Sequence, residues 1–125
     1  MNKMKLKLII PNILYAKWRI EENSIKNFIK TFGYWSWERS KPALKIFIND
    51  GNVIGEQSSS YLNLDEGDDE CMFFVPYHSK TYRTEFGRCL GKNIFIPLAC
   101  SNSIEIIKES GYSIFRLPIN FILKP

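Results

Sequence analysis

The chain has 125 residues, a formal net charge of +4, and 45% hydrophobic, 24% charged and 14% aromatic residues. This length and composition predict a single folded domain over residues 1–125, and they exclude disorder for most of the chain. The positive charge favours approach of an anionic partner, but lysines and arginines occur singly rather than in runs, so we expect no strong nucleic-acid signal.

The start of the chain, residues 1–12, is expected to be an extended N-terminal segment of the domain. Its apolar stretch from Met1 to Ile10 is interrupted by Lys5 and Lys7. It is too short for the core of a signal peptide or for a membrane span. We therefore expect no association with a membrane.

A half-buried strand is predicted from Ile13 to Ile20, because apolar and polar residues alternate there. From Ser24 to Phe32 the apolar residues follow the helical period instead, which predicts one short amphipathic helix. Asn23 or Ser24 is the expected N-cap, and Gly33 is the expected end of the helix.

The next strand is expected around Leu44–Ile48, where apolar residues alternate again after Pro42. The turn residues Asn49–Asn52 predict a hairpin that returns through a strand at Val53–Gln57. A further strand is expected at Tyr61–Leu64. The acidic stretch from Asp65 to Glu70 is expected to be an exposed turn.

Three more strands are expected at Cys71–Val75, Thr81–Gly87 and Ile94–Ala99, and Pro97 predicts a sheet edge or a bulge in the last of them. The pattern over 106–125 is unclear and is compatible with one added strand. Many short strands favour a mainly β fold, an immunoglobulin/fibronectin-type-like antiparallel β-sandwich with one short inserted helix. The alternative is an α+β domain with an antiparallel sheet packed on that helix.

The sequence contains few residues in patterns typical of a catalytic or metal-binding site. The cysteines Cys71, Cys89 and Cys100 have spacings typical of neither a disulfide framework nor a zinc site, which favours reduced thiols in a cytoplasmic protein. The single histidine, His78, follows Pro76 in an expected loop without a neighbouring nucleophile. We expect no enzyme activity, no cofactor and no metal.

The longest local motif is Tyr82-Arg83-Thr84-Glu85-Phe86-Gly87, followed by Gly91 and by Phe95-Ile96-Pro97-Leu98-Ala99-Cys100-Ser101-Asn102. Shorter motifs are Leu14-Tyr15-Ala16-Lys17-Trp18 and Leu44-Lys45-Ile46-Phe47 with Asn49-Asp50. Together they resemble the bacterial family called domain of unknown function 4912, over residues 13 to 105. The resemblance implies an accessory module, because some members of that family stand beside glycan-processing catalytic domains. Lys17 and Arg19 depart from the family, which more often has an aromatic residue and an acid there.

The aromatic segment Tyr34, Trp35 and Trp37, with Arg39 close behind, is the preferred candidate binding surface. One short helix and its linker cannot bury every ring, and planar rings beside a cation suit stacking on a sugar or contact with a protein.

Glu85 and Asn102 are two further candidates for ligand contact. Glu85 lies in a predicted strand and needs a cationic partner, for which Arg83, Arg88 and Arg116 are candidates. Asn102 follows the last strong strand, where ending the strand is favoured over ligand contact.

The sequence therefore predicts a non-catalytic binding or scaffolding module, with a protein partner as the first expectation. A carbohydrate-binding accessory domain is the alternative. A carboxylate-dependent enzyme using Glu85 is the third and weakest hypothesis.

Overall fold

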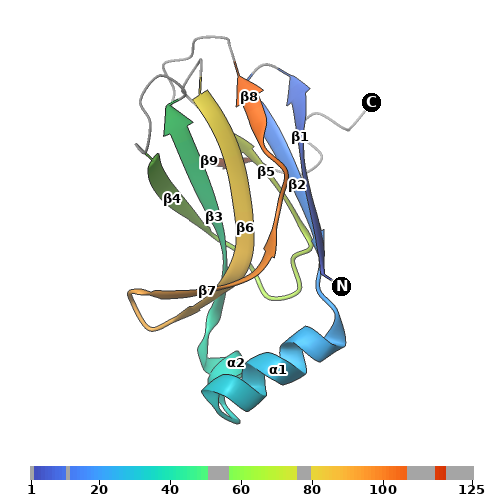
Figure 1. The fold of residues 1–125 in the computed structure, drawn as a ribbon, viewed down its shortest axis with the longest axis vertical. Helices are drawn as coiled ribbons and strands as arrows, with labels where there is room; N and C mark the ends of the chain where they lie inside the picture. Colours follow the sequence, from blue (N-terminus) through green and yellow to red (C-terminus); the bar gives the residue numbers. More distant parts are fainter. Residues whose placement is uncertain (1, 11, 51–56, 76–79, 107–114, 118–125) are drawn as a thin grey trace.

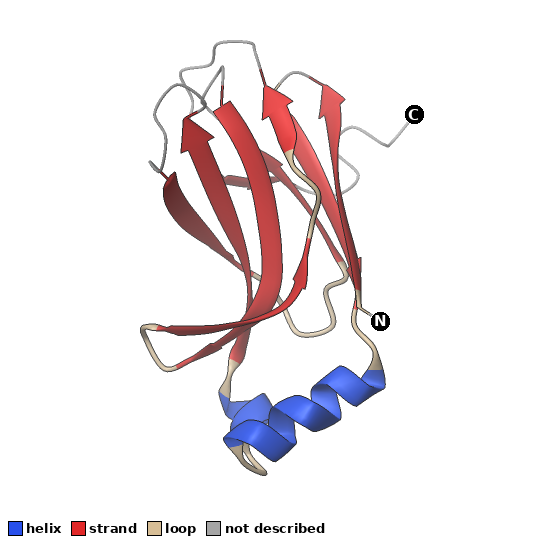
Figure 2. Cartoon of the chain, viewed as in Figure 1, coloured by secondary structure: helices blue, strands red, loops and turns tan. Residues whose placement is uncertain are grey.

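A computed structural model describes residues 2–10, 12–50, 57–75, 80–106 and 115–117. Two antiparallel sheets face each other, and two short helices lie together at one end of them (Figures 1 and 2). The expected antiparallel β-sandwich with an inserted helical segment is confirmed. The helices cover an end of the sandwich rather than a face of a sheet, so the α+β alternative is not formed.

The first sheet, called here the β1 sheet, has the strand order β1-β2-β5-β9. Its strands are β1 (Lys3–Ile10), β2 (Ile13–Arg19), β5 (Glu70–Phe74) and β9 (Phe115–Leu117). The second, called the β3 sheet, has the order β4-β3-β6-β7, and β8 also pairs with β6. Its strands are β3 (Lys41–Asp50), β4 (Gln57–Asn63), β6 (Lys80–Leu90), β7 (Ile94–Cys100) and β8 (Ile104–Ile106).

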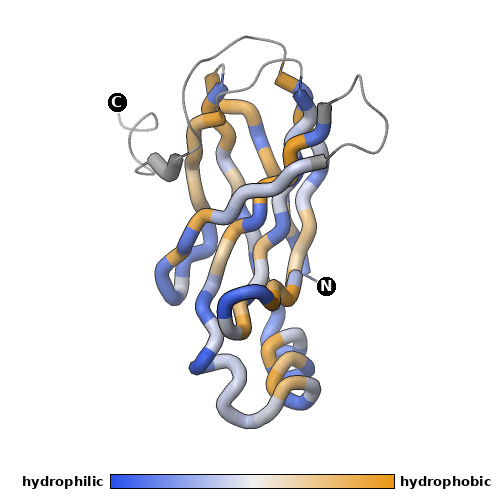
Figure 3. The backbone as a smooth tube through the Cα atoms, turned by 90° about the vertical axis from the view of Figure 1, so that its left-hand side faces the viewer, coloured by the Kyte–Doolittle hydropathy of each residue, from blue (hydrophilic) through white to orange (hydrophobic). Residues whose placement is uncertain are grey.

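The core lies between the sheets and is built by alternating residues of their strands. Leu14, Ala16 and Trp18 of β2 are buried, as the period-2 pattern predicted. From the other sheet, Phe86 stacks on Trp18 with ring centroids 4.9 Å apart, which ties the two layers together. Figure 3 shows the corresponding alternation of hydrophobic and hydrophilic positions along the strands.

The first helix, α1 (Glu22–Phe32), starts earlier than expected, and both predicted N-caps are wrong. Neither Asn23 nor Ser24 is the N-cap, which is Glu21 without a side-chain cap of its own. The carboxamide oxygen of Asn2 instead accepts hydrogen bonds from the Glu21 N–H at 2.8 Å and the Ser24 hydroxyl at 3.0 Å. A side chain from a distant segment of the chain therefore anchors the start of α1.

The predicted end of this helix is confirmed. Gly33 has a φ of 109°, and its N–H donates to the carbonyl of Ile29 at 2.8 Å. A second helix that the sequence pattern did not predict, α2 (Ser36–Arg39), follows directly and leads into β3.

The second half of the chain differs from expectation mainly in its strand limits. The β3–β4 hairpin is confirmed, but β4 is one strand over 57–63 where two short strands were expected. Residues 51–56, which hold half of the expected turn and most of the expected strand Val53–Gln57, lie outside the described residues, as does His78. Both expectations for Pro97 are confirmed, because β7 is an edge strand and its pairing with β6 is shifted by a bulge.

Asn102 closes the sandwich on one side. Its carboxamide oxygen accepts from the Leu6 N–H at 2.8 Å, and its Nδ2 donates to the Leu6 carbonyl at 3.0 Å. A single side chain thereby occupies a donor and an acceptor of the edge strand β1 and joins it to the segment after β7.

Replacing Asn102 with Ala should therefore destabilise the fold. We expect Asn102→Ala to lower the free energy of unfolding by about 2 kcal/mol, because two hydrogen bonds to β1 are lost. Urea denaturation measures this loss. The exposed neighbour Ser103 is the control, and an equal loss in Ser103→Ala would contradict the role given to Asn102.

Candidate functional site

The candidate site is formed where the β6–β7 hairpin turns across the lower end of the β3 sheet (Figure 1). The strand pairing shifts between Phe86 and Gly87, which bends the hairpin away from the regular sheet. A Cβ atom at Gly87 would lie 2.2 Å from the carbonyl oxygen of Ile96, so the close approach of β7 requires glycine here.

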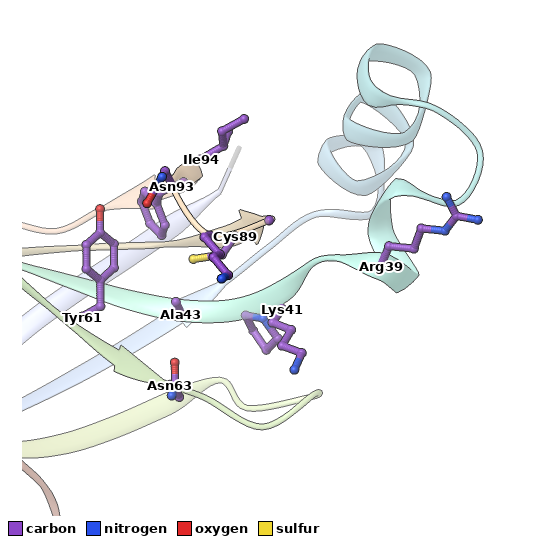
Figure 4. A pocket seen from close by; sticks show the side chains of 12 residues that line it. Arg39, Lys41, Ala43, Tyr61, Asn63, Cys89, Asn93 and Ile94 are labelled. Atoms are coloured by element: carbon purple, nitrogen blue, oxygen red, sulfur yellow. The ribbon is translucent and has the colours of Figure 1, made fainter.

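A pocket of about 570 Å³ lies under this hairpin, bordered by α2, β3 and β4. Its lining combines three cations, two aromatic rings and two amides, and no lining residue among those described carries a carboxylate. Figure 4 shows several of these side chains around the hollow. The groups concerned are Arg39, Lys41 and Lys92, then Tyr61 and Phe95, and then Asn63 and Asn93.

The ammonium group of Lys45 lies close to the aromatic rings of the pocket. The rings of Tyr61 and Phe95 meet edge to face with centroids 5.6 Å apart, and they join β4 to β7. The Nζ of Lys45 lies 5.5 Å and 5.7 Å from these two centroids and 4.8 Å from that of Phe47. Tyr61 nevertheless keeps 49% of its surface exposed, so its ring is available to a ligand.

Arg88 is the buried cation that holds the helical segment against the sandwich. Its side chain is only 2% exposed, and it stacks over the ring of Trp37 with its guanidinium carbon 4.1 Å from the centroid. Its Nε donates to the Ser40 hydroxyl at 2.7 Å, and its Nη2 donates to the carbonyls of Trp37 and Ser40, both at 2.9 Å. Both terminal nitrogens also bind the carboxylate of Glu66.

These contacts determine where the pocket begins. Trp37 lies in α2 and Ser40 is the C-cap of that helix, so the contacts that hold them also position Arg39 and Lys41, which line the pocket. The expected acidic turn contributes as well, because the Glu66 carboxylate from that turn neutralises Arg88. Most of that turn is exposed, as expected.

Loss of the Arg88 guanidinium should be costly. We expect Arg88→Met to lower the free energy of unfolding by about 3 kcal/mol, because the Ser40 hydroxyl and the carbonyls of Trp37 and Ser40 each lose a hydrogen bond. Urea denaturation provides the measurement. Arg83→Met is the control: its ion pair with Glu85 is partly exposed and should be worth about 1 kcal/mol or less. Equal losses in the two variants would show that Arg88 has no special role.

The aromatic segment predicted as a binding surface is divided by the structure. Tyr34 and Trp35 are 77% and 53% exposed and meet edge to face with centroids 4.7 Å apart. Trp37 points inward, between Arg88 and the ring of Phe28, whose centroid is 5.3 Å away. Two rings of this segment are therefore available at the surface, and the third is structural.

The remaining predicted residues lie apart from one another. Arg39 lines the pocket, whereas Asn102 binds β1 at another edge. Glu85 lies on the outer face of the β3 sheet and pairs with Arg83 at 3.4 Å, so Arg83 is the partner it takes, while Arg88 binds Glu66. Of the six candidates, only Arg39 lines the pocket.

Sequence reasoning missed the other polar and aromatic residues that line the pocket. A signal was present: Gly87 and Pro97 mark the bulge that bends β7 across the sheet, and several residues between them, from Gly91 to Phe95, line the pocket. No comparable signal marked Tyr61 and Asn63, because these residues reach the pocket only through the pairing of β4 with β3.

The outer face of the β1 sheet holds a second feature of interest. The Tyr15 hydroxyl donates to a carboxylate oxygen of Glu70 at 2.5 Å. Burial, followed by this hydrogen bond and the negative charge of Glu70, raises the pKa of Tyr15 to about 12. The folded state therefore retains the phenolic proton at a pH where an unfolded chain has lost it.

This raised pKa predicts a pH effect with a definite sign. The stabilisation by Tyr15 is present below its unfolded pKa of about 10 and is lost as pH rises toward the folded value of about 12. We expect a tyrosinate absorbance component with a midpoint near pH 12, and we expect Tyr15→Phe to remove it. Tyr34→Phe is the control and should leave that component in place. Its persistence in Tyr15→Phe would assign the effect to another tyrosine.

The three cysteines are free thiols in β5, β6 and β7, as the sequence led us to expect. No cluster of His, Cys, Asp and Glu suited to a metal ion occurs among the described residues. In the same residues, no helix is long and apolar enough to cross a membrane.

Comparison with known proteins identifies a family. Searches of curated proteins and of solved structures find no significant match. The profile of the family described as domain of unknown function (DUF4912) matches residues 1–113, which is most of the chain. The motifs around Tyr82–Gly87 and Phe95–Asn102 that resembled this family lie within the match and within β6, β7 and the segment after them. The chain therefore belongs to the DUF4912 family.

Proposed function

We propose that the protein is a non-catalytic interaction module that binds an extended, acidic segment of a partner protein. The observation that carries this proposal is the pocket under the β6–β7 hairpin, whose described lining holds three cations and two rings but no carboxylate. Such a lining attracts carboxylates and apolar side chains together, which is the composition of an acidic peptide.

The edge strand beside the pocket supports an extended ligand. β4 ends the β3 sheet, and no described strand pairs with its outer edge. Lysine, proline and charged side chains commonly protect a sheet edge from pairing with another strand. The sequence of β4, Gln-Ser-Ser-Ser-Tyr-Leu-Asn, contains none of them. Backbone groups on such an edge are free to pair with an added strand.

The two features lie next to each other. Tyr61 and Asn63 belong to β4 and also line the pocket. A peptide strand paired with β4 would direct every second side chain to the outer face of the sheet, where Lys41 and the Tyr61 ring are found. Backbone pairing would supply affinity, and the cations would select acidic sequences.

A fluorescent peptide of alternating Glu and Val tests the charge requirement by anisotropy. We expect it to bind, and we expect the double variant Arg39→Glu/Lys41→Glu to weaken binding about tenfold or more, because two attractive contacts become repulsive. The matched control Lys3→Glu/Lys7→Glu reverses two exposed charges on β1, outside the pocket, and should bind as the wild type does. A peptide with Lys in place of Glu should not bind.

N-methylation of the peptide tests strand addition separately. Methyl groups on alternate residues block one edge of the peptide, and methyl groups on the other residues block the opposite edge. We expect only one of the two methylated peptides to lose binding. If both bind as well as the parent peptide, strand addition at β4 is disproved, and if neither wild-type nor variant protein binds the parent peptide, the proposed function is wrong.

A carbohydrate ligand is the second candidate, and one specific observation favours it. The half-exposed ring of Tyr61 stands beside the carboxamides of Asn63 and Asn93, and sugars bind to rings flanked by hydrogen-bonding groups. The three cations favour an acidic sugar within this class. A glycan array probed with wild-type protein and Tyr61→Ala separates this candidate from the peptide ligand.

A further inference from the structure

Five cations gather on the outer face of the first two strands, away from the pocket. Lys3, Lys5 and Lys7 occupy alternate positions of β1, and Lys17 and Arg19 occupy alternate positions of β2. Antiparallel pairing places Lys3 directly opposite Arg19 and Lys5 directly opposite Lys17. All five side chains are exposed. We call this group the basic ladder.

The ladder is poorly neutralised within the described part of the chain. Lys17 has one long ion pair, at 3.8 Å to Asp69, with both side chains more than half exposed. No described carboxylate pairs with the other four cations. Like charges directly opposite each other destabilise a sheet, so this face carries an electrostatic cost that a bound polyanion would remove.

The geometry points to single-stranded nucleic acid as the ligand of the basic ladder. Residues two apart on a strand are about 6.6 Å apart, so the cations form two parallel rows with a regular repeat. A linear phosphodiester chain carries one charge per nucleotide and fits such rows. A shallow cavity of about 430 Å³ runs between them, lined by the ladder together with Tyr15 and two neighbours.

The surroundings of the ladder favour a narrow polyanion over a planar anionic membrane. β5, the next strand, places Glu70 opposite Lys17, and Asp69 precedes it. A flat bilayer laid on this sheet would meet these carboxylates as well as the lysines. A single strand of nucleic acid lying along β1 and β2 would contact the cations without covering these carboxylates.

Tyr15 adds a second element of this recognition. It lies on the same face as the ladder, directly opposite Lys7, and it lines the cavity. A ring next to a row of lysines suits stacking of one base while the phosphates meet the cations. The face offers few groups that could read base edges, so binding should be insensitive to sequence.

Salt dependence of binding to a labelled oligothymidylate tests the proposal. Five phosphate contacts on a single strand predict a slope of about −3.5 for the logarithm of the binding constant against the logarithm of salt concentration. The double variant Lys5→Gln/Lys17→Gln should reduce that slope by about 1.4, because two contacts are removed. A second pair, Lys3→Gln/Lys7→Gln, should do the same. These positions are exposed, and melting curves verify folding.

The matched control is Lys41→Gln/Lys92→Gln, which removes the same charge from the pocket under the β6–β7 hairpin. An unchanged slope in this control supports the ladder, whereas an equal reduction shows diffuse charge attraction and overturns the proposal. Equal or tighter binding to a DNA duplex or to vesicles containing phosphatidylserine also overturns it. Peptide binding in the pocket should persist in the ladder variants, so failure of either site can be recognised independently.

Discussion

The buried guanidinium of Arg88 is the interaction on which the remaining architecture depends. An isolated buried cation would be very costly, yet here each donor nitrogen has an acceptor, from Ser40, Trp37 or Glu66. Those acceptors belong to α2 and to the turn before β5. One side chain of β6 therefore connects the helical segment, the acidic turn and the sandwich, and it fixes the point where β3 begins.

The bulge at Gly87 provides the second constraint, one residue before Arg88. It bends β7 across the outer face of the β3 sheet, and that bend converts a flat sheet surface into a concave one. Backbone geometry at Gly87 and side-chain anchoring at Arg88 thus act together, because one creates a wall of the pocket and the other positions the lining residues Arg39 and Lys41. Neither requires the exposed rings of Tyr34 and Trp35, which lie outside the pocket.

Much of the sandwich could be predicted because its strands bury one face. Alternation over Ile13–Ile20 is a local property, and it identified the buried side of β2 correctly. The contacts that position the site are not local. Asn102 binds a residue 96 positions away, and Arg88 binds Glu66 at a separation of 22 positions. Polar residues of this kind carry no sequence pattern of their own, so the helix cap, the closing of the edge and the pocket were missed.

The basic ladder shows why a linear measure of charge misleads in a β protein. Along the sequence the lysines of β1 are separated from one another by single apolar residues, which suggested a weak electrostatic signal. In a strand, however, alternate residues share one face, and antiparallel pairing adds the cations of β2 to those of β1. The charge density on one face of a sheet therefore depends on which alternate residues share that face and on the register of strand pairing, rather than on runs of charged residues in the sequence. Lys17 and Arg19 supply the second row of that face.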